Sequence, residues 1–401
     1  MTSDQQSAQG VNDWTPTEER FTNLRTPEWE AEMGRLRKQC PVAHTELFGG
    51  FYTLSRYEDV AKASRDFRTY RSGQPFIRVP GMSGLIPSSL NPPEHGPYRK
   101  VLNTYFRPEI MNELEDAITR YAVDGISELT AAGCGDAVAA ICKPVPARAL
   151  ATWLRLGEDA HTQLLGHFTQ LGGDFDDPER MNELMFSVFA GHISKVVADR
   201  RANPRDSAVD VLQGILEMEV DGVPTSDETA VAVGVALIGA GHATTADALG
   251  SAIYRLAQDQ ELQQRLRDNP DLIVPASEEF LRLDSPLPER GRHTSTDVEL
   301  HGVTIPEGSL VALNYGSANH DEEKFERPTD CLIDRAPNQH LAFGFGPHQC
   351  AGAPLARLEL RVVLTELLAR TSSFSLAGEP ESVRGLMMNG LETLPLVIEG
   401  A

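Results

Sequence analysis

The stretch Phe343-Gly-Phe-Gly-Pro-His-Gln-Cys-Ala-Gly352 stands directly before a segment, Pro354 to about Thr371, whose pattern predicts a long amphipathic helix. Cys350 therefore lies where a helix begins, close to backbone N–H groups that have no partner within the helix and to the positive end of its dipole. This environment favours the thiolate, which is the form of cysteine that binds a metal. The glycines allow the backbone to turn sharply and to approach a flat ligand closely.

The surroundings of Cys350 narrow the kind of metal site. No second cysteine or histidine lies at zinc spacing, so a Cys/His zinc cluster is disfavoured. One thiolate on an open, flat site suits the iron of haem. The alternative is an inert, buried cysteine beside a glycine turn, because free cysteines usually lie in the core.

The stretch resembles the haem-binding loop of the cytochromes P450, Phe-x-x-Gly-x-(His/Arg)-x-Cys-x-Gly. Every fixed position of this pattern is matched, namely by Phe343, Gly346, His348, Cys350 and Gly352. The resemblance extends from about residue 19 to the C-terminus and is strongest after residue 226. It implies a mainly α fold with small β-sheets, a triangular helical body around a buried haem b, and Cys350 as the iron ligand. Gly344 is among the haem contacts that it implies.

The composition is that of a globular protein, with 41% hydrophobic and 23% charged residues in a chain of 401. The net charge of −22 disfavours nucleic acids and anionic lipid surfaces as partners, because both are themselves negative. We expect residues 1–18 to be disordered and residues 19–401 to form one monomeric domain. The polar N-terminal stretch predicts neither a signal peptide nor a membrane anchor, and five cysteines without a pairing pattern suit a reducing cytoplasm.

The pattern along the chain predicts helices joined by a few short strands. A strand is expected over residues 51–55, followed by a helix from residue 57, and residues 71–93 form a long loop of the kind that covers a pocket. A helix of about 33 residues, from 226 to 258, is apolar enough to be buried through the middle of the protein. Residues 298–314 alternate like a hairpin with its turn at 306–308.

The resemblance also assigns a structural cluster. Glu279 and Arg282 lie at positions i and i+3 of a helix expected over residues 275–283, so they share one helix face. Arg335 matches the third member of the family's Glu–Arg–Arg cluster. The implied role is to hold the scaffold of the cysteine loop.

Haem carries two propionates, and the resemblance implies basic residues that neutralise them. His95 and Arg99 match a family pair on one helix face, while Arg292 and His340 match further propionate contacts. Arginine suits a carboxylate because its guanidinium can donate two parallel hydrogen bonds. For each residue taken alone, a solvated surface charge is the alternative.

The oxygen side is predicted at Ala240-Gly241-His242-Ala243-Thr244, which resembles the family pattern (Ala/Gly)-Gly-x-(Asp/Glu)-Thr. Gly241 permits a local loosening of the helix, and Thr244 matches the alcohol that assists proton delivery. Ala243 stands where the family has an acid, and alanine cannot relay protons. Protons could instead arrive through water and His242 or another residue, the oxygen step could be slower or leakier, or the enzyme could use peroxide directly. We favour water, and we expect His242 to point away.

The implied activity is insertion of one atom of O₂ into a small apolar terpenoid or aromatic compound, by hydroxylation or O-dealkylation. A peroxide-driven peroxygenase and a non-catalytic haem sensor are the alternatives. The sequence contains no ferredoxin-like cysteine cluster, so electrons are expected from a separate ferredoxin and its reductase. A local basic face is predicted to dock that acidic ferredoxin, formed by Arg99, Lys100, Arg107, Arg357 and Arg361.

The family places the substrate against the 71–93 loop, the helices expected over residues 168–186, the central helix and two segments near residues 287 and 387. Apolar residues in these regions are expected to line the pocket, as in most small-molecule sites: Phe76, Ile77, Leu85, Ile86, Leu237, Leu287, Met387 and Met388. Each could instead be ordinary core. Arg78 is a candidate for a substrate carboxylate, but we expect it to face water.

Overall fold

A broken apolar helix runs through the middle of the molecule. The computed structural model describes residues 13–15, 26–77, 84–157, 162–163, 166, 188–220, 222–383 and 388–401. The segment predicted as one helix forms two consecutive helices, α10 (Asp227–Gly241) and α11 (Ala243–Gln258), and the side chain of Ser226 caps the first by accepting the N–H of Thr229. Among the described residues it is the one segment long and apolar enough to cross a membrane, although 44% of its most apolar window is buried inside the protein.

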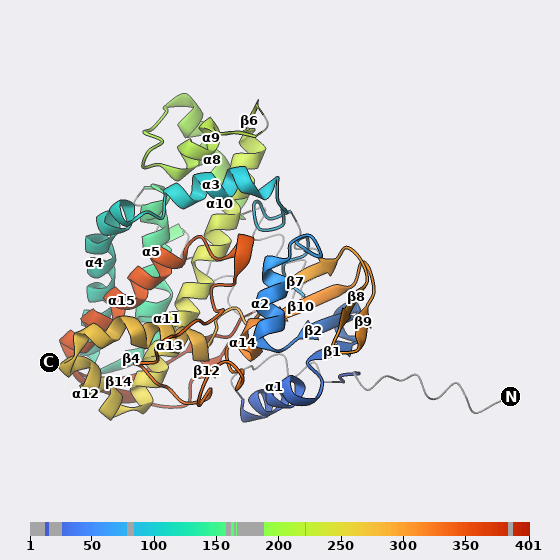
Figure 1. Ribbon diagram of the computed structural model, residues 1–401. Coiled ribbons are helices and arrows are strands. Elements are labelled where there is room, and N and C mark those ends of the chain that lie inside the picture. The colour runs from blue at the N-terminus through green and yellow to red at the C-terminus, as the bar shows by residue number, and fades with distance from the viewer. Residues whose placement is uncertain are drawn as a thin grey trace.

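The other helices surround this axis (Figure 1). They are α1 (Pro27–Gln39), α2 (Tyr57–Arg65), α3 (His95–Thr104), α4 (Pro108–Ala132), α5 (Pro144–Trp153), α8 (Ala190–Ala202), α9 (Val211–Glu217), α12 (Gln260–Asp268), α13 (Ile273–Leu283), α14 (Tyr315–Ala318) and α15 (Ala353–Arg370). A π-helical stretch covers Val138–Cys142, and 3-10 turns cover Leu47–Gly49, Pro270–Leu272 and Gly346–His348. The helix predicted directly after the cysteine loop is α15, and the helix expected over residues 275–283 is α13.

The main sheet lies beside the helical body and has five strands in the order β1-β2-β10-β7-β3 (Figure 1). Its strands are β1 (Val42–Thr45), β2 (Phe51–Leu54), β10 (Leu310–Asn314), β7 (Glu289–Thr294) and β3 (Tyr70–Arg71). β10 runs parallel to β2, and the other neighbouring pairs are antiparallel. The smaller sheets contain β4 (Cys134–Asp136), β5 (Glu219–Val220), β6 (Val223–Pro224), β8 (Val298–Leu300), β9 (Val303–Ile305), β11 (Thr371–Leu376), β12 (Glu381–Ser382), β13 (Leu391–Thr393) and β14 (Pro395–Gly400).

Residues 298–314, predicted as one hairpin, form a short hairpin of two strands followed by a third strand that belongs to the main sheet. β8 pairs with β9, and the turn between them is His301-Gly302, where both residues have positive φ (51° and 78°). Two consecutive positive φ values are typical of a tight hairpin turn. The expected turn at 306–308 instead leads into β10, which joins the main sheet between β2 and β7.

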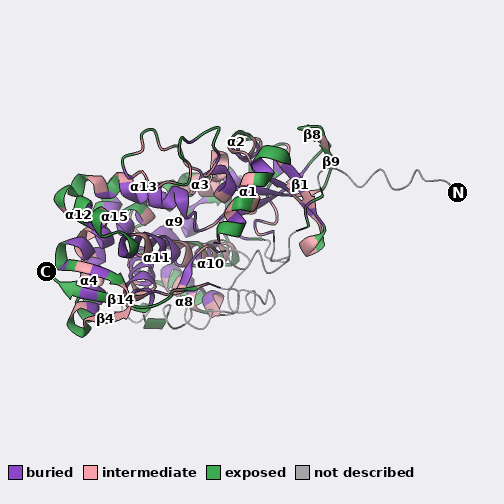
Figure 2. Cartoon of the chain, turned by 90° about the horizontal axis from the view of Figure 1, so that it is seen from below, coloured by how far each residue is buried: buried purple, intermediate pink, exposed green. Residues whose placement is uncertain are grey.

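Buried side chains form one large helical core and two smaller clusters about the sheet. Figure 2 shows continuous burial along α11 and α13 inside the helical body. The expected disorder of residues 1–18 falls mostly outside the described residues. At residues 13–15 the expectation is wrong, because Trp14 is buried, packs against Trp29 and donates its indole N–H to Glu32.

Candidate functional site

The cysteine loop folds back on itself and is held against α2. The N–H of Cys350 donates to the carbonyl of Phe343 at 2.8 Å. Gly346 has a φ of 75°, and a Cβ at this position would lie 2.5 Å from the carbonyl oxygen of Ser64 in α2. The guanidinium of Arg65, also in α2, stacks on the ring of Phe345 at 4.6 Å. The loop therefore requires glycine at position 346 for both conformation and space.

The sulfur of Cys350 lies at the N-terminus of α15. The backbone N–H groups of Gly352 and Ala353 hydrogen-bond to it. Burial raises the pKa of the Cys350 thiol, and this effect exceeds the lowering by these N–H groups and by Arg99 and Arg290. We expected the helix start by itself to favour the thiolate. The N–H groups there do lower the pKa of Cys350, but burial raises it by more, so the expectation is incomplete. A bound cation would supply the missing stabilisation, since metal coordination deprotonates a thiol.

A group of basic side chains surrounds the approach to Cys350. It is formed by His95 and Arg99 on α3, Arg290 and Arg292 on β7, and His348 in the cysteine loop. The rings of His95 and His348 lie 4.3 Å apart, and His348 Nε2 is 3.0 Å from the hydroxyl oxygen of Ser72. Burial, with added repulsion from Arg292, His95, Arg99 and Arg290, lowers the pKa of His348 to about 3. Burial and Arg99 also lower the pKa of His95, so both histidines are neutral at neutral pH.

The three arginines of this basic group carry its charge. None of them forms a salt bridge within the described part of the chain, and Nη1 of Arg290 is buried with no hydrogen-bond partner there. Arg292 is buried and Arg99 and Arg290 are half-buried, and guanidinium groups in such places without acidic partners are costly, so the arrangement calls for an anionic ligand. Four of the five residues were predicted as haem contacts, and the donor set fits the two propionates of haem.

The oxygen side is built where α10 ends and α11 begins. Gly241 is the last residue of α10, and the hydroxyl of Thr244 donates to the carbonyl of Ala240 at 2.9 Å, which satisfies a carbonyl at the break. A Cβ on Gly241 would lie 3.0 Å from Leu150 Cδ1, so α5 packs closely behind the junction. Leu237, Ala240 and Thr244 share one face of the helix and remain accessible in the centre of the molecule, as residues that line a cavity do.

His242 does not belong to that face. It is buried, and its Nε2 lies 3.0 Å from the carbonyl oxygen of Lys143, at the start of α5. Burial lowers the pKa of His242 to about 3. The structure therefore agrees with the expectation that His242 points away, and a role for it in proton delivery has no geometric support.

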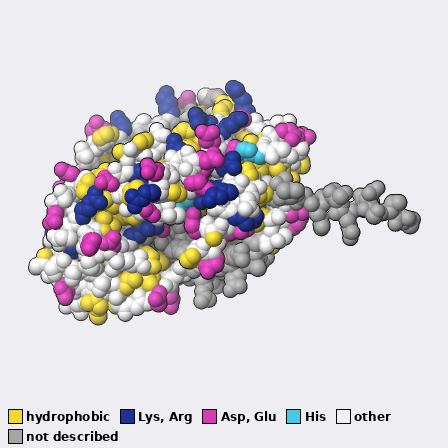
Figure 3. Space-filling view, turned by 60° about the horizontal axis from the view of Figure 1, so that its bottom comes forward, with side chains coloured by type: hydrophobic (Ala, Val, Ile, Leu, Met, Phe, Trp, Pro, Cys, Tyr) yellow, Lys and Arg dark blue, Asp and Glu magenta, His cyan; other side chains and the backbone are white. Residues whose placement is uncertain are grey.

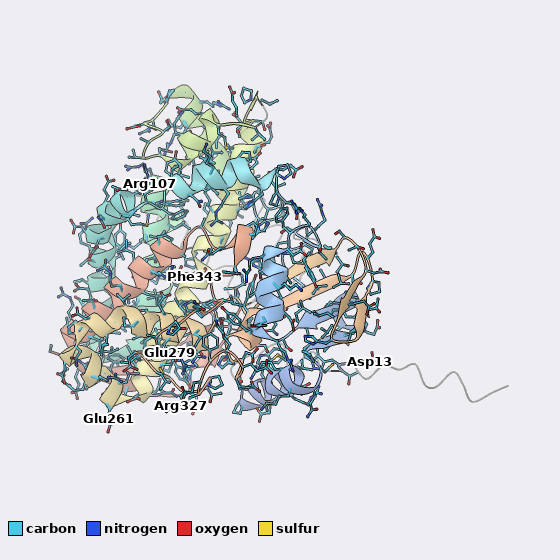
Figure 4. All side chains as sticks on the ribbon, viewed as in Figure 1. Asp13, Arg107, Glu261, Glu279, Arg327 and Phe343 are labelled. Carbon is cyan, nitrogen blue, oxygen red and sulfur yellow. The ribbon has the colours of Figure 1, made fainter. Side chains whose placement is uncertain are left out.

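The Glu–Arg–Arg residues meet as expected. Glu279 and Arg282 are fully buried and joined by two hydrogen bonds of 2.8 Å, and Arg335 Nε lies 3.1 Å from the same carboxylate. Arg282 also donates to the carbonyls of Asn319 and Pro328, which ties α13 to the segment leading toward the cysteine loop. Figure 4 shows Glu279 and Phe343 in the central part of the molecule.

His340 lies beside Glu278. Its Nε2 is 3.1 Å from Glu278, which also accepts two hydrogen bonds of 2.8 Å from Arg357. Burial opposes ionisation of Glu278, but the hydrogen bonds from Arg357 and His340 outweigh it and hold its pKa at about 2. The side chain of His340 thus contacts Glu278 of α13, which Arg357 of α15 also binds, and its role as a propionate contact stays a prediction.

The expected pocket residues divide into three sets. Phe76, Leu85, Ile86, Leu237, Leu287 and Met388 belong to the helical core cluster or pack against it, together with Ala243 and Phe343. Ile77 is instead buried in a separate cluster with Trp29 and Phe51, and its place in the pocket stays a prediction. Met387, Arg78 and the whole of the expected 168–186 helices lie outside the described residues.

The predicted basic docking face is only partly available. Arg357 is paired with Glu278, Arg361 with Glu115, and Arg99 lies close enough to Cys350 to affect its pKa. Lys100 and Arg107 remain exposed, and Figure 4 shows Arg107 where α3 meets α4. Figure 3 shows acidic and basic side chains interspersed over the face that it presents.

The comparisons with known proteins agree with this geometry. The cytochrome P450 family model matches residues 162–389. Cytochrome P450 130 of Mycobacterium tuberculosis is 33% identical over 342 residues, which cover 82% of this chain and 83% of that relative. The chain belongs to the cytochrome P450 family. As a cytochrome P450 it uses haem b and is a monooxygenase.

Solved cytochrome P450 structures share the whole fold. CYP108D1 from Novosphingobium aromaticivorans is 30% identical, with a TM-score of 0.83, and the match covers 94% of this chain and 95% of that one. CYP268A2 from Mycobacterium marinum, solved in complex with pseudoionone, is 27% identical, with a TM-score of 0.82 over 92% and 94% of the two chains. The prediction of a mainly α cytochrome P450 fold with small sheets is confirmed.

Sequence reasoning missed Arg290 and Ser72 as members of the site. Arg290 precedes Arg292 by two residues on β7, and the alternation of side chains along a strand could have revealed that both point to one side. Ser72 gave no signal, because only the folded chain brings it to His348.

Proposed function

We propose that this cytochrome P450 inserts one oxygen atom of O₂ into a small, mostly apolar terpenoid or aromatic compound, by hydroxylation or O-dealkylation. The observation that carries the proposal is the accessible face of Leu237, Ala240 and Thr244 in the centre of the molecule, bordered by an apolar core. Haem with a thiolate ligand supplies the oxygen activation and C–H oxidation when it is bound. The protein contributes binding, orientation and exclusion of water.

The cysteine side has the simplest assignment. Cys350 is the iron ligand, and the N–H groups of Gly352 and Ala353 at its sulfur moderate the electron density that the thiolate donates. Phe343, Gly344 and Gly346 shape the loop around it. His95, Arg99, Arg292 and His348 hold the propionates.

On the oxygen side, Thr244 is the residue that holds a proton. Its hydroxyl hydrogen is donated to Ala240, so the oxygen keeps lone pairs that can accept from a water or a ligand in the pocket. Ala243 provides no acid and His242 is turned toward Lys143. Proton delivery through water to Thr244 is therefore the route that the described residues support best.

The substrate can be identified by a spectral screen of purified protein. Terpenoid and aromatic compounds that displace water near the iron shift the haem to high spin, and turnover with NAD(P)H, a ferredoxin and its reductase should then give a product that is one oxygen atom heavier, or dealkylated. Pseudoionone, the ligand in the CYP268A2 complex, is a suitable first probe of an elongated apolar shape. The lack of an acid at position 243 favours one alternative, a peroxygenase, and product with peroxide but none with the electron-transfer partners would establish it.

The electron-transfer arrangement is also part of the proposal. A separate ferredoxin is expected to dock near the exposed Lys100 and Arg107, with an association rate that falls as salt rises. Residues 19–401 are proposed to act as one monomeric domain in the cytoplasm.

A further inference from the structure

The guanidinium of Arg290 is held beside the expected substrate loop. Gly291 allows this, because a Cβ there would lie 2.3 Å from the carbonyl oxygen of Gln74, and its N–H donates to the carbonyl of Pro75 at 2.9 Å. Gln74 in turn donates to the carbonyl of Phe76 at 3.1 Å. The result is a fixed stack in which Arg290 lies over the ring of Phe76 at 4.5 Å.

Arg290 has unused hydrogen-bonding capacity at this place. Its Nη1 is buried and has no partner among the described residues, and none of the salt bridges formed there involves it. The neighbouring Glu289 points to the opposite side of β7, because successive side chains on a strand alternate. Burial lowers the pKa of Arg290 to about 10, which still leaves it charged at neutral pH. A half-buried guanidinium whose Nη1 is buried without a partner among the described residues can bind an anion.

The charges of the basic group exceed those of the cofactor. Arg99, Arg290 and Arg292 supply three positively charged guanidinium groups, and none of them forms a salt bridge among the described residues. A ferric porphyrin with one thiolate ligand is neutral apart from its two propionates. Two propionates therefore balance two of the three arginines, and one positive charge remains.

The position of Arg290 indicates which anion balances it. Along the chain it lies between Leu287, which packs on the helical core with Leu237, and Arg292, the predicted propionate contact two residues further along β7. Its stacking partner Phe76 packs on the same core. Arg290 is thus at the boundary between the propionate-binding residues and the apolar pocket.

We propose that Arg290 binds a carboxylate of the substrate, so that the enzyme oxidises an organic acid with an apolar body. The inference rests on the proposed function and deepens it by naming the polar group that the substrate carries. Phe76 orients the guanidinium, and the apolar residues around Thr244 receive the rest of the molecule.

Binding of matched probes tests this directly. The haem spin-state shift of the holoenzyme is titrated with 4-isopropylbenzoate and 4-isopropylbenzamide, and with 4-methoxybenzoate and 4-methoxybenzamide. A charge-assisted pair predicts that the acids bind about 10- to 100-fold more tightly than the amides, and that Arg290→Gln abolishes this preference. Arg292→Gln is the matched control, and it should lower haem retention while leaving the preference intact.

Haem content and the spectrum of the reduced CO complex are measured for each variant. Equal affinity of wild-type protein for acid and amide, or no binding of either acid, would overturn the proposal. Loss of haem in Arg290→Gln with an unchanged acid preference in the remaining holoenzyme would also overturn it, since Arg290 would then be a propionate contact. These measurements need no turnover, so a failure of the proposed monooxygenase reaction would be seen separately.

Discussion

Replacing Gly346 by alanine should damage the cysteine loop more than any other single methyl addition there. Gly346 has a φ of 75°, and the added Cβ would lie 2.5 Å from the carbonyl oxygen of Ser64 and 3.0 Å from Cα of Arg65. Both are backbone atoms of α2 and cannot turn aside. The left-handed backbone costs about 1–2 kcal/mol and the close contact about 1–3 kcal/mol, so we expect about 2–5 kcal/mol less stability.

Gly344 provides the control for this substitution. Its φ is 68°, but the nearest atom to an added Cβ is the hydroxyl oxygen of Tyr315 at 3.5 Å, so Gly344→Ala carries the backbone cost without the clash. Chemical unfolding of the two holoenzymes, with haem content measured beside it, should separate them by about 1–3 kcal/mol. Equal loss of stability and haem in the two variants would refute the packing of this loop against α2.

Three further outcomes follow from the site. Ala243→Asp should restore an acid beside Thr244 and raise the fraction of electrons that end in product rather than in peroxide, and unchanged coupling and turnover would remove position 243 from proton delivery. Glu279→Gln leaves two arginines without their buried carboxylate and should cost about 3–5 kcal/mol of unfolding free energy. Glu366→Gln, at a surface pair with Arg370, should cost less than about 1 kcal/mol. Similar losses in the two variants would contradict the structural role of Glu279. The folded pKa of Glu278 is about 2, below its ordinary 4.5, so ionised Glu278 stabilises the fold above pH 4.5 and the contribution disappears as pH falls toward 2. Glu278→Gln should flatten this part of the curve of unfolding midpoint against pH, and an unaltered curve would count against the Glu278 pairing.

The sequence was sufficient where a function depends on residues close together along the chain. The loop around Cys350, the start of α15 and the Thr244 region of α10 and α11 are all of this kind, because spacing along one segment determines what each residue can reach. The family resemblance added the long-range pairing of Glu279 with Arg335.

The sequence was insufficient where the outcome depends on segments far apart. At Cys350 desolvation outweighs the effect of the helix start on the thiol pKa, and no local sequence pattern reports that desolvation. His340 contacts Glu278, a residue of α13, at the place where α13 packs against α15. Ile77 packs in the cluster of Trp29 and Phe51, and Gly291 leaves room for this because a Cβ there would lie 3.2 Å from Ile77 Cδ1.

The ligation of iron by Cys350 is tested most directly by the absorption spectrum of the reduced CO complex. The wild-type protein should show the red-shifted band that gives the family its name, since only thiolate ligation produces it. Cys331→Ser, which changes a cysteine outside the loop, should keep the band, and Cys350→Ser should lose it. A red-shifted band that survives in Cys350→Ser would contradict the assignment of Cys350 as the iron ligand.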